Sequence, residues 1–234
     1  MADHMPNTHT NNVFMPPEKV KTTLYNWVEA DLSFKKIRYG ETISNPFPTI
    51  YYLDEYYPWR EVQGLPYTNK CRRKTARILN LKNNHIKELN YYRYAIGYFL
   101  RNTEFVLRVC AIPSQLAGVR TEHLWEIFSN MVHEQKVTFE DSLMRVVDTN
   151  KKSTTTGALR NPEIDYLTMG VISITPGACY LIMDDVTTSG ASLMAATRFL
   201  YEKGARKVFC LALSKTTHLD NNSENMDNLP EEYQ

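Results

Sequence analysis

Short apolar runs alternate with amphipathic stretches along most of this chain, a pattern typical of a sheet whose strands are joined by helices. The runs predicted to be strands are 105–112, 142–147, 171–174, 179–183 and 207–213. The stretches with apolar residues at helical spacing, predicted to be helices, are 18–34, 77–101, 122–135 and 190–203. Asn83 and Asn84 are expected to break the second of these helices. The alternation predicts an α/β fold with a mainly parallel sheet.

The segment 180–213 contains the clearest strand–turn–helix–strand unit. Its first four residues, Tyr180–Met183, are apolar and suit a strand buried on both faces. Two acids, Asp184 and Asp185, follow where that strand should end. A small turn rich in hydroxyl groups comes next, and it consists of Thr187, Thr188, Ser189 and Gly190. A helical pattern begins at Ala191, and Gly204 stands where a helix end is expected.

Such a turn has the chemistry of a phosphate site. A helix N-terminus offers free N–H groups and the positive end of a dipole, so it favours anions. Gly190 has no Cβ to block a ligand, and the nearby hydroxyl groups add donors. Two carboxylates would repel the same phosphate, but they can accept hydrogen bonds from a ribose 2′,3′-diol. Together these groups describe a ribose 5-phosphate site. The alternative is an ordinary strand-to-helix turn with an N-cap, for which the paired acids and the full set of hydroxyl groups are surplus.

The stretch Asp184-Asp-Val-Thr-Thr-Ser-Gly-Ala-Ser192 resembles the phosphoribosyl-pyrophosphate (PRPP) signature of the type I phosphoribosyltransferases. The likeness covers roughly 78–215 and is strong only in this stretch. It implies a doubly wound α/β fold with a mainly parallel sheet, helices on both faces and an N-terminal extension or hood. We therefore expect an N-terminal arm and hood-like extension at 1–76, a phosphoribosyltransferase-like domain at 77–215, and an acidic mobile tail at 216–234.

Within that family the chain is most similar to the ComF-type phosphoribosyltransferases. The similarity rests on the Leu81-Lys82 step, on Ala111-Ile-Pro-Ser114, and on the segment rich in Arg and Thr from Arg145 to Arg160. ComF-type chains often open with paired cysteines that resemble a zinc site. This chain has no such pairs, so no metal ribbon is expected. The turn after Pro113 also lacks the basic residue that often follows a pyrophosphate loop.

The resemblance assigns a role to each candidate site residue. Asp184 and Asp185 are expected to hold the ribose diol, and either could contact a metal through water. The 5′-phosphate is expected to bind the rest of the signature, which is Val186, Thr187, Thr188, Ser189, Gly190, Ala191 and Ser192. The pyrophosphate candidates are Lys82, Pro113, Ser114 and Gln115, and the residues expected to close over the site are Lys151, Lys152 and Arg160. A plain surface role remains open for each of these basic residues, and Asp185 could instead accept a proton from an incoming base.

The implied activity is Mg²⁺-dependent transfer of a 5-phosphoribosyl group from PRPP to a nitrogen base, with release of pyrophosphate, as in nucleotide metabolism. The alternative is a binding module that senses PRPP or a nucleotide without turnover and engages a protein partner. A metal-dependent phosphohydrolase with the pattern D-x-D-x-T needs acids two residues apart. Here the acids are adjacent and Val186 fills the required position, so we set that function aside.

Composition limits the partners and the compartment. The formal net charge of +1 gives no overall field that would draw the chain to nucleic acid or to a membrane. No apolar run approaches the roughly 20 residues of a membrane helix. The four cysteines show no C-x-x-C pairing, and Cys110, Cys179 and Cys210, which lie in or beside apolar runs, are expected to be buried thiols. This fits a reducing cytoplasm. The expected partners are PRPP and a nucleobase-like acceptor, and a homodimer is left open.

Two further segments have an ordinary interpretation and a functional one. The aromatic segment Tyr51–Trp59 could be a partner surface or a wall for base stacking, but we favour a tyrosine-rich strand or loop packed on the domain. The basic cluster Cys71–Arg77 could meet phosphate or nucleic acid, but we favour the solvated start of a helix.

Overall fold

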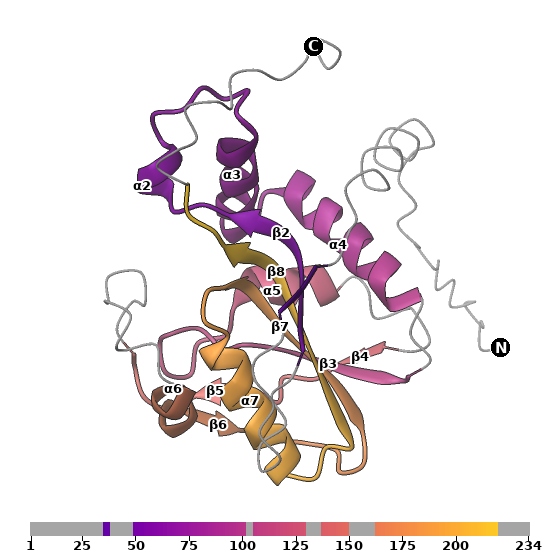
Figure 1. Ribbon diagram of the computed structural model, residues 1–234. Coiled ribbons are helices and arrows are strands. Elements are labelled where there is room, and N and C mark those ends of the chain that lie inside the picture. The colour runs from indigo at the N-terminus through magenta and orange to yellow at the C-terminus, as the bar shows by residue number, and fades with distance from the viewer. Residues whose placement is uncertain (1–34, 38–48, 102–104, 130–136, 150–161, 220–234) are drawn as a thin grey trace, which may run out of the picture. The chain divides into compact units, whose positions relative to one another are not determined.

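The computed structural model describes residues 35–37, 49–101, 105–129, 137–149 and 162–219 (Figure 1). Within these residues six strands form one sheet in the order β1-β2-β8-β7-β3-β4. Their bounds are β1 (Lys35–Ile37), β2 (Ile50–Tyr56), β3 (Leu107–Ala111), β4 (Val137–Phe139), β7 (Cys179–Thr187) and β8 (Lys207–Thr216). Only the pair β1–β2 within this sheet is antiparallel. The predicted α/β fold with a mainly parallel sheet is confirmed.

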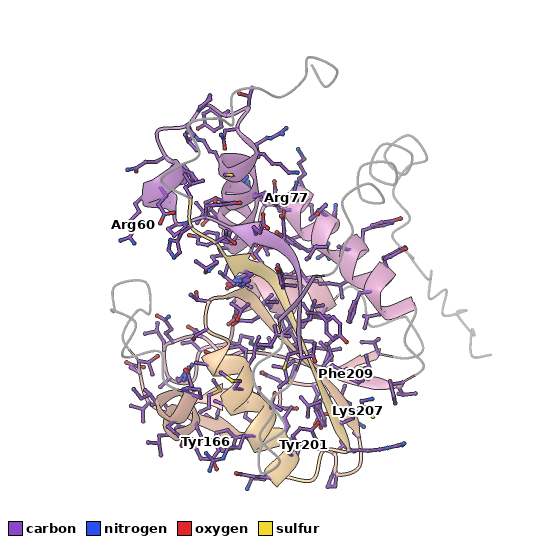
Figure 2. All side chains as sticks on the ribbon, in the orientation of Figure 1. Arg60, Arg77, Tyr166, Tyr201, Lys207 and Phe209 are labelled. Atoms are coloured by element: carbon purple, nitrogen blue, oxygen red, sulfur yellow. The ribbon has the colours of Figure 1, made fainter. Side chains whose placement is uncertain are left out.

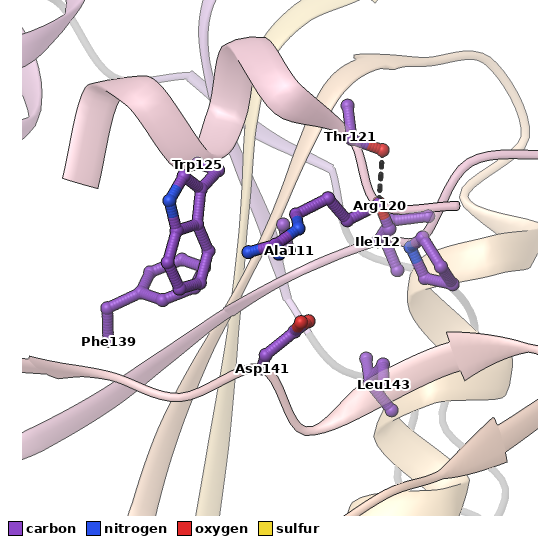
Figure 3. A pocket seen from close by; sticks show the side chains of 9 residues that line it. Ala111, Ile112, Arg120, Thr121, Trp125, Phe139, Asp141 and Leu143 are labelled. Atoms are coloured by element: carbon purple, nitrogen blue, oxygen red, sulfur yellow. Dashed lines mark hydrogen bonds between the residues drawn. The ribbon is translucent and has the colours of Figure 1, made fainter. Parts of the chain in front are cut away.

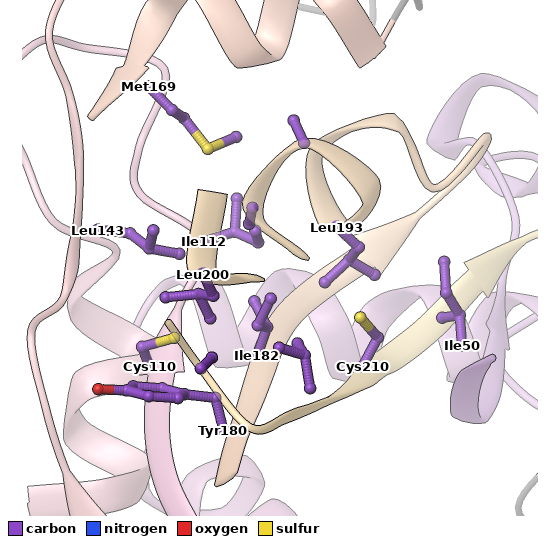
Figure 4. Close-up of a cluster of buried hydrophobic side chains, with 14 of the residues drawn as sticks. Ile50, Cys110, Ile112, Leu143, Met169, Tyr180, Ile182, Leu193, Leu200 and Cys210 are labelled. Carbon is purple, nitrogen blue, oxygen red and sulfur yellow. The ribbon is translucent and has the colours of Figure 1, made fainter. Parts of the chain in front are cut away.

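Helices cover both faces of the sheet, as expected (Figure 1). The helix α7 (Ala191–Glu202) lies on one face, and α3 (Lys70–Lys82), α4 (Ile86–Arg101) and α5 (Glu122–Ser129) lie on the other; a short helix, α2 (Trp59–Val62), precedes α3. All residues from 179 to 183 of β7 are buried. Because successive side chains of a strand point to opposite faces, both faces of this part of β7 are covered. Tyr180 and Ile182 pack in one core with Leu193 and Leu200 of α7 (Figure 4), so the apolar run fixes this strand in the centre of the sheet.

A second, smaller sheet corrects one prediction. We expected a strand at 142–147 in the parallel sheet, but β5 (Leu143–Arg145) pairs antiparallel with β6 (Met169–Val171) instead. The parallel sheet takes its edge strand from β4, which the sequence pattern did not reveal. Three residues are too few for a period of two to be recognised. A helix, α6 (Pro162–Thr168), which we did not predict, lies between β5 and β6.

The predicted break in the helical region 77–101 is confirmed. Helix α3 ends at Lys82, α4 begins at Ile86, and Asn84 between them has a φ of 56°. Helix α3 begins at Lys70, however, so the expected domain boundary at 76/77 falls inside a helix.

The aromatic segment forms β2, as we favoured, and it belongs to the main sheet. Ile50 and Leu53 are buried, and β2 runs parallel to β8. Part of the segment assigned to an N-terminal extension is therefore part of the sheet. The predicted helix at 18–34 lies outside the described residues, as do residues 130–136 of the predicted helix 122–135 and residues 220–234 of the acidic tail.

Candidate functional site

The carboxyl end of β3 lies beside β7 and brings two predicted site segments together. Strand β7 continues to Thr187, so Asp184 and Asp185, which we expected to follow the strand, belong to it. Ala111 of β3 is aligned with Met183 of β7, and Ile112 N–H donates to the Met183 carbonyl oxygen at 2.7 Å. The acids Asp184 and Asp185 and the turn that starts at Pro113 therefore lie at the same edge of the sheet. In parallel α/β sheets this is the edge where ligands bind.

One carboxylate oxygen of Asp185 contacts two side chains, the ammonium group of Lys82 and the imidazole ring of His123. Lys82 Nζ, from the last turn of α3, lies 3.0 Å from Asp185 Oδ2. His123 Nε2, from the first turn of α5, lies 2.7 Å from the same atom. Both of these side-chain contacts go to Oδ2, while the backbone N–H of Asp185 donates to Asp184 Oδ1 at 2.9 Å. The Asp185 side chain itself is 14% exposed.

These contacts set the charge of Asp185. Burial alone would raise the pKa of this carboxyl group, but Lys82 and His123 together hold it well below its usual range. In return Asp185 overcomes the effect of burial on Lys82 and raises the pKa of its ammonium group. An aspartate held in its ionised form is a weak proton acceptor. The geometry therefore favours a hydrogen-bonding role for Asp185 over the role of a base.

His123 is the residue of this cluster that sequence reasoning missed. It lies 62 positions before Asp185, outside the signature. A signal was present: it lies within the stripe of α5 that also buries Leu124, Ile127 and Phe128. A histidine on an otherwise apolar helix face needs a polar partner, and here that partner is Asp185.

In the turn between β7 and α7, most hydroxyl groups do not accept hydrogen bonds from the first amides of α7 in the described residues. Gly190 occupies the N-cap position with a φ of 76°, where a residue with a side chain would be strained, and it offers no side-chain cap. The only side-chain acceptor shown for a first-turn amide of α7 in the described residues is Ser189 Oγ, 3.4 Å from Ala191 N. Thr188 bonds with Thr216, and the buried Thr187 hydroxyl has no hydrogen-bond partner among the described residues. The hydroxyl groups are thus surplus to the N-cap.

The turn after β3 is held mainly by bonds within the protein. Gly118 N–H donates to the Arg145 carbonyl oxygen at 2.9 Å, and Ala117 N–H donates to Asp148 Oδ1 at 2.6 Å. Ser114 N–H likewise donates to the Val119 carbonyl oxygen at 3.2 Å. Leu116 N–H donates to Ser114 Oγ at 3.3 Å, so the amide of the pyrophosphate candidate Ser114 and three further amides of this turn are already engaged. The loop residues Lys151, Lys152 and Arg160 lie outside the described residues.

A small pocket beside this turn is too small for a base. It is lined by residues from the ends of β3 and β4, the start of α5 and the start of β5: Ala111, Ile112, Pro113, Arg120, Thr121, Trp125, Phe139, Asp141 and Leu143 (Figure 3). Its volume of about 10 Å³ is roughly that of one water molecule.

The basic cluster on α3 is largely used inside the protein. Lys74 and Arg77 form ion pairs with Asp54 of β2, and the Arg72 guanidinium lies 3.8 Å from the centre of the Tyr67 ring. Side chains held in this way are poorly placed to meet phosphate or nucleic acid. The cluster is the start of a helix, as we favoured, but it is not fully solvated, because Lys74 and Arg77 are largely buried in their ion pairs.

A metal site needs a cluster of ligating side chains, and a membrane-spanning helix needs a long apolar stretch. No group of three or more His, Cys, Asp or Glu residues there is placed to hold a metal ion. None of the helices described combines the length and apolarity that crossing a membrane requires.

Comparisons with known proteins give little further information. No family model and no curated protein matches the chain. Two crystal structures of a hypoxanthine phosphoribosyltransferase from Staphylococcus aureus, in orthorhombic and tetragonal space groups, are similar to it at 12% identity and a TM-score of 0.31. They match 66% of this chain and 85% and 84% of their own. A TM-score this low carries no argument, so the function must be argued from the site.

Proposed function

We propose that this chain binds PRPP and transfers its 5-phosphoribosyl group to a nitrogen base, with release of pyrophosphate. The observation that carries the proposal is the turn at 187–190. Its hydroxyl groups are not needed for capping, it opens into a helix N-terminus, and it directly follows two acids at the carboxyl edge of the sheet.

Each part of this edge has a role in the proposal. The 5′-phosphate binds at the start of α7, where the amides and the Thr188 and Ser189 hydroxyl groups donate to it. The ribose diol donates to Asp184 and to Asp185 Oδ1. Lys82 and His123 hold the Asp185 carboxylate in one orientation and keep it ionised. Positioning of this kind lowers the barrier because the reacting centre is already oriented.

Mg²⁺ fits this donor set only as a hydrated ion. It prefers oxygen ligands, keeps several waters and is commonly bound through substrate phosphates. Asp185 Oδ2 already contacts the Lys82 ammonium group and the His123 ring, so a direct bond from that atom to a metal would compete with them. When bound beside the leaving pyrophosphate, Mg²⁺ would neutralise its charge.

A second candidate is a PRPP-binding module without turnover. It is favoured by the turn after β3, whose amides at Ser114, Ala117 and Gly118 are engaged within the protein. A turn that does not release those amides would bind the leaving group poorly. The chain would then recognise the phosphorylated sugar without stabilising departure of pyrophosphate.

One pair of assays separates these possibilities. Calorimetry with PRPP and Mg²⁺ should show binding to the native chain and at least about a tenfold loss in the variant Asp184→Asn/Asp185→Asn, because each lost acceptor costs about 1.5 kcal/mol. Glu88→Gln, on α4, is the matched control and should bind as the native chain does. Pyrophosphate release with a panel of bases then distinguishes transferase from binder. Unchanged PRPP binding by the double variant, with its circular dichroism intact, would refute the site.

A further inference from the structure

A buried ion pair lies between the two loops of the candidate site. Arg145 of β5 is 1% exposed and Asp165 of α6 is 2% exposed, and Arg145 Nη1 lies 3.2 Å from Asp165 Oδ1. The same nitrogen donates to Thr168 Oγ1 at 2.7 Å. Burying two charges is costly, and an apolar pair of similar size would often be at least as stable. The pair therefore calls for a role beyond packing.

The arginine contacts the turn that follows β3. Its Nε donates to the Ser114 carbonyl oxygen at 3.4 Å, and its own carbonyl oxygen accepts from Gly118 N–H at 2.9 Å. Both ends of the turn at 114–118 are therefore bonded to Arg145. This is the turn in which the pyrophosphate candidates lie.

The aspartate contacts the other loop of the site. Ser192, in the first turn of α7, donates from Oγ to Asp165 Oδ2 at 3.2 Å. A continuous chain of polar contacts thus runs from Ser192 through Asp165 and Arg145 to Ser114. It joins the proposed 5′-phosphate turn to the proposed pyrophosphate turn through buried atoms.

Contacts on the outside of α6 hold Asp165 in place independently of any ligand. The Tyr166 ring stacks on Phe199 of α7 at 4.2 Å, and the Arg198 guanidinium lies 3.8 Å from the Tyr166 ring centre. Arg198 also pairs with Glu163. Figure 2 shows Tyr166 on this side of the protein, next to α7. These contacts fix α6 on α7. A rotation of the Ser192 hydroxyl group therefore removes a hydrogen bond from Asp165 while α6 stays in place.

We propose that Arg145 and Asp165 are positioning residues that couple phosphate binding at the start of α7 to pyrophosphate binding at the turn 114–118. The inference rests on the function proposed above. The Ser192 hydroxyl group has one proton, so it donates either to Asp165 or to a bound phosphate. When phosphate takes that proton, the Asp165 carboxylate loses the Ser192 donor, and the Arg145 guanidinium is drawn toward it. The long contact to the Ser114 carbonyl oxygen then breaks, which removes one of the two bonds by which Arg145 holds the turn 114–118 and lets the turn shift to meet pyrophosphate. Each ligand therefore favours binding of the other.

The experiment measures this coupling directly. Pyrophosphate is titrated into the native chain in Mg²⁺ buffer, with and without saturating ribose 5-phosphate, by calorimetry. The native chain should bind pyrophosphate about fivefold or more tightly when ribose 5-phosphate is present. Ser192→Ala removes the hydroxyl group at one end of the path, and Asp165→Asn removes the buried charge. In both variants the ratio of the two affinities should fall to about one.

Ser189→Ala is the matched control. It removes another hydroxyl group of the same turn, one that bonds to Ala191 N and not to Asp165. It should weaken binding of ribose 5-phosphate yet keep the coupling. Ser192 is half-buried, so its alanine variant tests the path even if Asp165→Asn does not fold.

The outcomes separate this inference from the proposed function. If the native chain binds both ligands with no change in affinity, or if Ser192→Ala keeps the full coupling, the inference is overturned and the function stands. If the native chain binds neither ligand, the proposed function itself fails.

Discussion

At the scale of single residues, the chemistry of the site depends on how one carboxylate oxygen is shared. Asp185 Oδ2 contacts Lys82 and His123, which come from two different helices. A carboxylate held by an ammonium group and an imidazole ring stays ionised and keeps a fixed orientation, and both properties suit an acceptor for sugar hydroxyl groups.

The first prediction concerns the pH dependence of stability. The pKa of Asp185 is lower in the folded chain than in the unfolded chain, so the ionised group stabilises the fold above the ordinary pKa of about 4. This stabilisation is lost as the pH falls below that value. Asp185→Asn should therefore lower the free energy of unfolding by about 2 kcal/mol at pH 7. The difference from the native chain should shrink below pH 4.

Urea unfolding at several pH values between 3 and 7 would measure this difference. Asp141→Asn replaces an exposed carboxylate and serves as the control, with no comparable change at any pH. A difference for Asp185→Asn that stays constant down to pH 3 would show that the shifted pKa does not stabilise the fold.

The sequence could predict only part of this cluster. Asp184 and Asp185 were recognisable because an acid pair between an apolar run and a hydroxyl-rich turn is a local pattern. His123 was not, because it reaches Asp185 only after β3 and β7 pair and place α5 over the site. Lys82 was selected by resemblance alone, and its contact with Asp185 depends on where α3 ends.

At the scale of elements, the break between α3 and α4 depends on one backbone conformation. Asn84 has a φ of 56°, a left-handed value that asparagine tolerates better than most residues with a side chain. Its N–H donates to the Leu81 carbonyl oxygen at 2.8 Å, which helps to end α3. Lys82 lies in the last turn of α3, so this break also sets where the lysine points.

Substitution of Asn84 should separate backbone strain from side-chain contacts. Asn84→Ala should lower the free energy of unfolding by about 1 kcal/mol, because alanine is strained in this conformation. Asn84→Gly is the matched control and should be neutral or slightly stabilising. Thermal unfolding of both variants measures the effect, and an equal loss in both would show that the side chain matters more than φ.

Long elements could be predicted from the sequence and short ones could not. The helices α4, α5 and α7 and the strands β3, β7 and β8 carry enough apolar residues to be recognised, whereas only the end of α3 was. The three-residue strands β4 and β5 do not, and their partners depend on the path of the whole chain. For this reason 142–147 was assigned to the wrong sheet.

At the scale of the whole molecule, the thiols are buried throughout the described fold. Cys71, Cys110, Cys179 and Cys210 are all free and buried. Burial raises the pKa of Cys210 to about 12 and also raises that of Cys110. Thiols in this state are poor nucleophiles because the thiolate is the reactive form.

Thiol labelling should therefore report unfolding. Ellman's reagent at pH 8 should modify the native chain at least about tenfold more slowly than the chain in urea, where all four thiols react at once. The urea sample at the same pH is the control for reagent reactivity. Rapid modification of even one thiol in the native chain would show that a part of the core opens easily.

The register of β2 with β8 has a consequence for synthesis of the chain. Ile50 is aligned with Cys210, so β2 lies beside a strand that is translated about 160 residues later. Until the ribosome has released residues 207–216, β2 lacks this neighbour, and a growing polypeptide exposes a hydrogen-bonding edge that other chains could occupy. Chaperones should therefore be needed to cover β2 until late in translation, and this need should end once β8 has emerged from the ribosome.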